Sequence, residues 1–428
     1  MRSSVKAHTP HHGLLPRQMQ ALLESTRLIN STLDLDELLQ IIVEEINRNL
    51  TADRTTLYLV DKKKGEIWSK VLLGDESLFI RQAIGKGISG YVAKTGQIIN
   101  IPDAYKDSRF NPEVDKKSGY KTRSILCAPV LDKNNKIIGV IQTLNKKRAE
   151  FNDHDIRFLQ ALAVNIAIAI ENARLYQEAL ERKKLENEIS LAGEINKYLL
   201  PQEIPNIPGY EIFAYHQPSK YIGGDYFDFF TFPDKLLFVL ADVSGKGVPA
   251  ALLMANLHAA FHTLCNEVTS CVSLIKKINS HFNLFTAPDR YATLFLGKLH
   301  LKSNRLEYIN CGHIPPMLFN YGSSKNNVTY LEHGGVPLGF MEDYDFQLGK
   351  VEFKPESYLI ICSDGITEAM NKKGEMFGRD KILEFTEKNL SLSLKKFGDQ
   401  FLKKVFRFSK EGTYHDDITL QILKRNAG

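Results

Sequence analysis

The chain has 428 residues, of which 43% are hydrophobic and 25% charged, and its formal net charge is +5. This length exceeds what one hydrophobic core supports and predicts two or three folded units, while the composition excludes wholesale disorder. The charge is small and forms no basic block, which excludes a nucleic-acid-binding role. The longest apolar runs, such as residues 161–170, fall short of the ~20 residues that cross a bilayer, so we expect no membrane contact.

The first residues of the chain and its cysteines indicate the cellular compartment of the protein. The first sixteen residues lack the apolar run of a secretory signal, so we interpret them as a retained tail. Five cysteines without a C-x-x-C pair favour reduced thiols over disulfides or a zinc site. We therefore expect a cytoplasmic protein.

The first 150 residues predict a mixed α/β domain. A helix is expected over 35–50, where Asp34 and Glu37 have capping-box spacing and apolar residues recur at helical intervals. A turn at Asn134 and Asn135 between two apolar runs predicts a hairpin. The predicted strands are 55–60, 67–73, 98–101, 124–131 and 136–145.

From Asp153 to about Leu200 the pattern is that of one long helix, interrupted only by Gly193. Its apolar stripe is too long to be buried by one small domain, and its middle, residues 178–188, is highly charged. We expect this helix to pair with its copy in a homodimer as a coiled coil. The alternative is a helix that lies on its own catalytic domain.

Beyond three prolines at 201–208, a second compact region is expected, with a helix over 249–264. Its predicted strands are 235–240, 291–301, 306–310, 358–362 and 418–423. Four acidic clusters stand where a strand meets a turn. They contain Asp225 with Asp228, Asp242, Asp364, and Asp416 with Asp417.

These clusters predict a metal centre. A carboxylate beside a very apolar strand is costly to bury without a cation or hydrogen-bond donors. Hard divalent cations take oxygen ligands, and a two-ion site can activate water for attack on phosphorus. A single Asp-Gly pair would indicate only a turn, but here several carboxylates recur in order along one region.

The motifs resemble those of a known family. Residues 222–228 (IGGDYFD), 241–254 (ADVSGKGVPAALLM), 291–295 (YATLF), 310–316 (NCGHIPP), 335–339 (GVPLG), 363–368 (SDGITE) and 416–419 (DDIT) resemble the SpoIIE-type branch of the metal-dependent PPM protein phosphatases. The resemblance covers essentially all of residues 205–425. It implies an αββα sandwich, and hence an α+β chain, with two Mn²⁺ or Mg²⁺ ions.

The resemblance also implies the ligands. Asp242 would bridge both ions, and Asp225 with the carbonyl of Val243 would serve one of them. Asp364 and either Asp416 or Asp417 would serve the other, with Asp416 favoured. The nucleophile would be a metal-bound water held by Asp225, Asp242 and Asp364.

Other residues near the motifs are open to two interpretations. His313 could be a general acid, but its turn sequence favours a structural role. Lys220 and Lys246 are candidates for binding the phosphate. Residues 223–227 also approach the GGDEF motif of diguanylate cyclases, but Tyr226 replaces a required acid and the surrounding domain order does not fit.

Residues 28–172 resemble a GAF domain through stretches at 31–39, 85–96 and 128–133. The glycine-rich stretch is no Walker motif, because Ile88 and Ala93 stand where glycines are required. Four residues resemble the NKFDE pattern of cyclic-nucleotide-binding GAF domains and would support a pocket: Asn145, Lys146, Phe151 and Asp155. The ligand would be cAMP or cGMP; the alternative is another small molecule, or a role in dimerisation only.

The expected organisation is a tail with the start of a helix (1–27), a GAF sensor (28–172), a connector helix (173–204) and a phosphatase domain (205–428). We expect a small-molecule effector in the sensor to act through the connector on the metal site. By resemblance, the substrate would be a phosphorylated STAS-type anti-sigma-factor antagonist. The alternative is a ligand-gated scaffold that binds a phosphoprotein without turnover.

Overall fold

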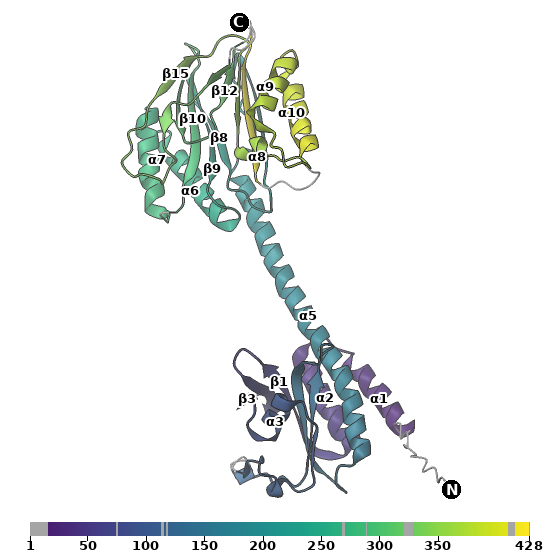
Figure 1. Cartoon of the computed structure of the whole chain (residues 1–428). Coiled ribbons are helices and arrows are strands. Elements are labelled where there is room, and N and C mark those ends of the chain that lie inside the picture. Colours follow the sequence, from purple (N-terminus) through teal and green to yellow (C-terminus); the bar gives the residue numbers. More distant parts are fainter. Residues whose placement is uncertain are drawn as a thin grey trace, which may run out of the picture. The chain divides into compact units, whose positions relative to one another are not determined.

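The computed structural model describes residues 16–73, 76–112, 115–116, 119–267, 270–287, 289–320, 328–409 and 416–427. The chain divides into two compact units, Met1–Lys183 and Lys184–Gly428 (Figure 1). Of the predicted tail, residues 1–15 lie outside the described part, and Pro16–Ile29 form helix α1.

The N-terminal unit is built on a six-stranded sheet of order β3-β2-β1-β6-β5-β4. Its strands are β1 (Ala52–Asp61), β2 (Glu66–Leu73), β3 (Glu76–Ala83), β4 (Ile99–Ile101), β5 (Ile125–Leu131) and β6 (Ile137–Lys146). Its other elements are α2 (Leu35–Leu50), α3 (Gly87–Thr95) and the short η1 (Ala104–Lys106). The predicted helix and strands are confirmed, and β3 was not predicted.

Side-chain alternation along β1 divides this unit into two apolar layers. Leu57 and Leu59 point into a core shared with α2 and the start of the long helix. Tyr58 lies in a second core beneath α3. Both faces of the sheet are therefore covered.

Two local predictions in this unit are confirmed by hydrogen bonds and dihedral angles. The Asp34 carboxylate accepts the amide protons of Asp36 and Glu37 at 2.9 and 3.0 Å and caps α2. Glu37 does not return the bond to the Asp34 amide but accepts from the Thr32 hydroxyl. In the β5–β6 hairpin, Asn135 adopts a φ of 58°, a conformation that asparagine tolerates.

Helix α5 (Asp153–Tyr198) confirms the predicted long helix. By length and hydropathy alone it is one helix that could cross a membrane, and half of its apolar window is buried inside the structure. From Phe158 to Ala173 its apolar face packs in the N-terminal core. Beyond this segment several large apolar side chains are exposed: Leu175, Tyr176, Leu180, Leu185, Leu191, Ile195 and Tyr198.

The C-terminal unit contains two sheets. One has the order β14-β11-β10-β9-β8, with β15 also paired to β11, and the other has the order β13-β12-β16-β17-β7. The strands are β7 (Tyr210–Gln217), β8 (Tyr226–Thr231), β9 (Lys235–Val243), β10 (Ala292–His300), β11 (Arg305–Cys311), β12 (Met317–Phe319), β13 (Val328–Tyr330), β14 (Gly334–Gly335), β15 (Gly349–Glu352), β16 (Tyr358–Cys362) and β17 (Ile418–Arg425). All five strands predicted here are confirmed.

The two sheets pack face to face between two helical layers. Ile361 points into the core shared by both sheets, whereas its neighbour Ile360 points into the core under the outer helices of the second sheet. The helices are α6 (Val248–Leu264) and α7 (Cys271–Phe285) on the first sheet, and α9 (Gly378–Asn389) and α10 (Leu394–Phe408) on the second (Figure 1). This is the predicted αββα sandwich.

Candidate metal centre and sensor pocket

The four acidic clusters lie at strand ends that the pairing of the sheets brings together. Asp225 directly precedes β8, and Asp242 lies at the end of β9, where Tyr226 pairs with Ala241. Asp364 begins the short helix α8 (Asp364–Thr367), just after β16. Asp416 and Asp417 lead into β17, which pairs with β16.

Burial and mutual repulsion raise the pKa values of three of these carboxyl groups. Burial, and then Asp242 and Asp417, hold the pKa of Asp225 well above its usual range. Burial, followed by Asp364 and Asp416, raises the pKa of Asp242 to about 7. Burial and Asp416 raise the pKa of Asp364 to about 6. The five side chains therefore form one electrostatic cluster.

The donor set fits divalent cations. Among the described residues, Lys246 is the only basic side chain that forms an ion pair with these five carboxylates; its Nζ lies 2.8 Å from Asp416 Oδ2. One lysine does not balance five clustered acids, and the ligand atoms are the oxygens that Mg²⁺ and Mn²⁺ prefer. Bound cations would offset the burial and the mutual repulsion that together raise the pKa values of these carboxyl groups.

Asp416 and Asp417 differ in what they contact. Asp417 is buried, and its carboxylate accepts the amide protons of Ser219 at 2.8 Å and Gly224 at 2.7 Å. Asp416 is partly exposed and faces Lys246. Asp416 Oδ1 accepts the amide proton of its neighbour Asp417 at 3.1 Å. Asp417 thus ties β17 to the loop before Asp225, whereas the contacts of Asp416 are to its chain neighbour and to Lys246. His415 of the same motif lies outside the described residues.

Hydroxyl groups hold the buried carboxylate of Asp225 in place. The Thr419 hydroxyl donates to Asp225 Oδ2. Ser363 Oγ donates to the Asp417 carbonyl at 3.0 Å and accepts the Thr419 amide proton at 2.9 Å. Thr419 and Ser363 therefore fix the position of Asp225 relative to β16 and β17.

Glycines allow close approach at two points of the centre. A Cβ at Gly224 would lie 3.2 Å from the carbonyl oxygen of Val243, so this carbonyl stands against the residue before Asp225. A Cβ at Gly365 would lie 2.0 Å from the Asp417 carbonyl. A side chain at either position would push the acidic segments apart.

Arg290, which the sequence analysis missed, adds positive charge beside the loop that follows Asp242. Its Nη1 donates to the Ser244 carbonyl at 3.2 Å, and a Cβ at Gly245 would meet the guanidinium at 2.2 Å. The only sequence signal was its position one residue before the predicted strand that begins at Tyr291. Lys220, one of the two predicted candidates for phosphate binding, is exposed.

His313 is buried beneath the centre. Its Nδ1 lies 2.9 Å from the Thr293 hydroxyl, and Thr293 pairs with Asp242 across β10 and β9. Burial lowers the pKa of His313 to about 4. The imidazole is therefore neutral at physiological pH, in line with the structural role expected for it.

In the N-terminal unit, the NKFDE-like residues connect three segments. Asn145 is buried; its side chain accepts the Arg123 amide proton at 2.6 Å and donates to the Lys121 carbonyl at 2.9 Å. Lys146 pairs with Asp155 at the start of α5, and its Nζ lies 5.9 Å from the centre of the Phe151 ring. These residues hold the loop before β5 against β6 and α5.

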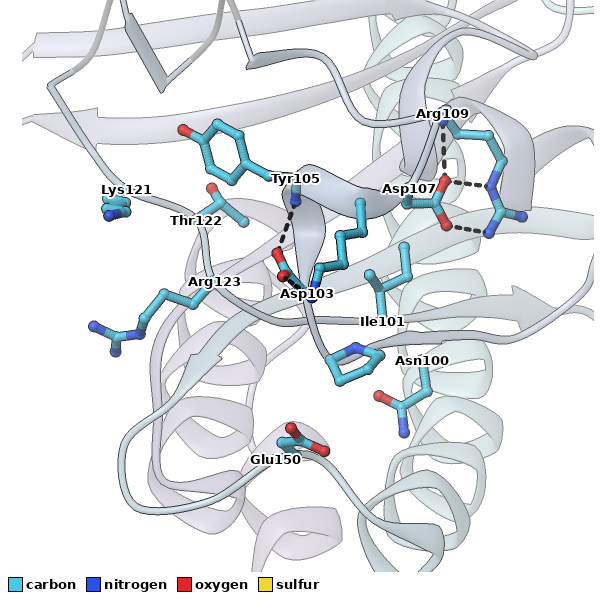
Figure 2. A pocket seen from close by; sticks show the side chains of 12 residues that line it. Asn100, Ile101, Asp103, Tyr105, Asp107, Arg109, Lys121, Thr122, Arg123 and Glu150 are labelled. Atoms are coloured by element: carbon cyan, nitrogen blue, oxygen red, sulfur yellow. Dashed lines mark hydrogen bonds and ion pairs between the residues drawn. The ribbon is translucent and has the colours of Figure 1, made fainter.

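That loop forms one wall of a cavity of about 700 Å³ (Figure 2). Arg109 is held by two hydrogen bonds to Asp107, at 2.9 and 2.6 Å. Lys106 pairs with Asp103 at 3.1 Å. The lining is polar and rich in basic groups: Asn100, Ile101, Pro102, Asp103, Tyr105, Lys106, Asp107, Arg109, Lys121, Thr122, Arg123 and Glu150.

Comparison with known proteins assigns both units. Residues 233–426 match the family "Stage II sporulation protein E (SpoIIE)", and residues 34–170 match the GAF domain. The chain therefore combines a GAF domain with a SpoIIE-type phosphatase domain, of the class of metal-dependent serine/threonine phosphatases.

Particular relatives agree with this assignment. The chain is 25% identical over 273 residues to the phosphoserine phosphatase RsbU of Bacillus subtilis, which covers 64% of this chain and 79% of the relative. It is 37% identical over 192 residues to a dual cyclic-AMP and cyclic-GMP phosphodiesterase 11A of Takifugu rubripes, covering 42% of this chain but only 21% of that protein. The SiaA-PP2C domain of Pseudomonas aeruginosa superimposes with a TM-score of 0.52 at 19% identity, covering 58% of this chain and all of that domain.

Proposed function

We propose that this chain dephosphorylates phosphoserine or phosphothreonine on a STAS-type anti-sigma-factor antagonist, under control of its GAF domain, in the cytoplasm. The observation that carries the proposal is the convergence of five carboxylates from four segments beside a single paired lysine. The similarity to a phosphoserine phosphatase supports the substrate class.

The proposed ligands are Asp225, Asp242, the carbonyl of Val243, Asp364 and Asp416. Two Mn²⁺ or Mg²⁺ ions bound there would lower the pKa of a coordinated water and neutralise phosphate charge. Asp417 is better placed as a support, because its oxygens are already engaged by backbone amides.

The protein's own residues would position the phosphate. Lys246 pairs with Asp416, and Arg290 contacts Ser244 and Gly245 in the loop that follows Asp242. Both side chains are partly exposed and can reach a surface phosphoserine. We assign phosphate attraction to them in place of Lys220.

The polar cavity of the GAF domain would bind the effector, a cyclic nucleotide such as cAMP or cGMP. Lys106, Lys121 and Arg123 supply positive charge for a cyclic phosphate, and Asn145 fixes the backbone that carries two of them. In this proposal the NKFDE-like residues support the cavity wall from behind.

The connector helix supplies a physical link to the metal centre. A Cβ on Gly193 of α5 would lie 2.1 Å from the Tyr221 carbonyl, so the helix touches the segment that runs into Gly223, Gly224 and Asp225. A rotation or shift of α5 would therefore move a ligand-bearing loop. We propose that pairing of α5 in a homodimer sets its position.

The experiment is release of phosphate from a phosphorylated STAS-domain protein by the full chain, with Mn²⁺ and with or without cAMP or cGMP. We expect turnover that needs metal and changes with nucleotide. Turnover that ignores both nucleotides would overturn the ligand assignment alone. Stable binding of the phosphoprotein without turnover would favour the scaffold alternative.

A further inference from the structure

A second cluster of ligand-type side chains lies on the outer face of β8, away from the acidic centre. It consists of Asp228 on β8 with His258 and His262 on α6. Their candidate ligand atoms all lie within 4.8 Å of one another. The two histidines are one helical turn apart, and their ring centroids are separated by 4.2 Å.

The carboxylate of this cluster is buried and held in place. Asp228 Oδ1 accepts the Phe229 amide proton at 2.7 Å, and Oδ2 accepts the Tyr226 hydroxyl proton at 2.9 Å. Its ion-pair partner within the described residues is His262, whose Nε2 lies 2.8 Å from Oδ2. A buried carboxylate with only an ionisable histidine as counter-charge is a favourable cation ligand.

The histidines can offer free lone pairs. Within the part of the chain that the structure describes, neither ring nitrogen of His258 has a hydrogen-bond partner. Burial and the neighbouring His262 lower the pKa of His258, which keeps this imidazole neutral, as a metal ligand must be. His262 is half exposed, and its Nε2 already faces Asp228 Oδ2 at 2.8 Å.

We infer that Asp228, His258 and His262 form a site for a transition-metal cation of the Zn²⁺ type. Two imidazoles and one carboxylate are a common zinc donor set, and they select Zn²⁺ over Mg²⁺ or Mn²⁺. Ligand atoms of a tetrahedral zinc site lie about 3.3 Å apart, so binding requires only a modest contraction of the cluster. The fourth position stays open to solvent beside His262.

Such a cation would join α6 to β8. Both elements start close to the acidic centre, because β8 begins one residue after Asp225 and α6 begins six residues after Asp242. The cation would therefore brace the two segments that present these aspartates. It would be a structural or regulatory ion, distinct from the Mn²⁺ or Mg²⁺ of the phosphatase reaction.

The test is titration of the full chain with Zn²⁺, and with Co²⁺ as a visible-absorbing substitute, in excess Mg²⁺ to occupy the carboxylate centre. The Asp242→Asn background removes residual binding there. We expect one equivalent to bind with the absorption of four- or five-coordinate Co²⁺. His258→Gln, His262→Gln and Asp228→Asn should each weaken binding at least about tenfold.

The matched control is His281→Gln, which removes a histidine of α7 outside the cluster and should leave binding unchanged. Circular dichroism checks that each variant is folded. Absence of a bound equivalent in excess Mg²⁺, or equal affinity in folded histidine variants, would overturn the site. Neither result would affect the phosphatase proposal, because these residues take no part in the acidic centre.

Discussion

Among single residues, Asp416 and Asp417 are adjacent but differ in their contacts. These contacts suggest a cation ligand at Asp416 and a structural support at Asp417. Both oxygens of Asp417 accept backbone amide protons in a buried position. Asp416 is partly exposed, accepts the amide proton of its neighbour Asp417, and faces Lys246. A support and a cation ligand should respond differently to truncation.

We predict that Asp416→Ala raises the Mn²⁺ concentration needed for half-maximal activity at least about tenfold, without lowering the unfolding temperature. Asp417→Ala leaves the partly buried Ser219 amide and the buried Gly224 amide unpaired and should lower the free energy of unfolding by about 1–3 kcal/mol. Metal titration of activity and thermal unfolding distinguish the two. The reverse pattern would show that Asp417 is the ligand.

Glu307 on β11, outside the metal centre, is expected to make the folding stability depend on pH. Its burial opposes ionisation, but Lys298 at 3.0 Å and His300 at 3.2 Å outweigh that cost and lower the pKa of Glu307 to about 2. A depressed carboxyl pKa adds stability above the unfolded pKa of about 4.5, and this is lost as the pH falls toward 2.

We therefore predict that the urea midpoint of the wild-type chain falls more steeply between pH 5 and pH 3 than that of Glu307→Gln. Equal slopes over the acid range would mean that the ion pairs of Glu307 add nothing to stability.

At the scale of elements, α5 contains a glycine that helix propensity alone would exclude. Replacing Gly193 by alanine would favour an isolated helix by roughly 1 kcal/mol. In the folded chain the added Cβ would lie 2.1 Å from the Tyr221 carbonyl and 3.4 Å from Ile222. Contact with the neighbouring loop explains the glycine.

We predict that Gly193→Ala destabilises the C-terminal unit by about 1–3 kcal/mol and lowers phosphatase activity, because the loop that carries Asp225 must shift. Ser190→Ala, an exposed site one turn earlier, is the control and should be neutral. Denaturant unfolding with parallel activity measurements checks both. A stabilised and fully active Gly193→Ala would show that α5 does not press on this loop.

The elements that the sequence predicted well are those with strong local signals. Helix α2 follows from its apolar period and the Asp34 cap, and β16 from an unbroken apolar run bounded by Ser363. Strand β3 was missed because residues 76–83 mix polar and apolar types, and its pairing with β2 sets its conformation. Local patterns cannot report such tertiary partners.

The residues of the candidate sites also differ in how well the sequence predicted them. The acidic ligands lie at strand ends in recognisable motifs, so their convergence could be predicted. Arg290 and the cluster of Asp228, His258 and His262 could not, because their proximity depends on how β8, α6 and the loop after β9 pack. The sequence analysis did not single out His258 and His262, whose four-residue spacing indicates only a shared helix face.

At the scale of the whole molecule, the exposed apolar side chains of α5 bear on assembly. Leu180 and Leu185 are 38% and 57% exposed beyond the segment that packs in the N-terminal core. An apolar stripe left in water is unfavourable, and pairing with a second α5 would bury it. This is the basis of the proposed homodimer.

We predict that the full chain sediments as a dimer and that Leu180→Lys with Leu185→Lys converts it to a monomer. Lys184→Glu, which changes charge on the same segment without removing apolar surface, should remain dimeric. Sedimentation velocity at several concentrations measures this directly. A wild-type chain that is monomeric at all concentrations would rule out pairing of α5 as the route of regulation.

We propose that the clustered aspartates form a metal centre that hydrolyses phosphate esters. The most direct measurement is Mn²⁺-dependent hydrolysis of p-nitrophenyl phosphate by the wild-type chain and by Asp242→Ala and Asp364→Ala. We predict activity that requires Mn²⁺ or Mg²⁺, is abolished by a chelator, and falls at least about a hundredfold in each folded variant. Activity that survives both substitutions would contradict the assigned centre.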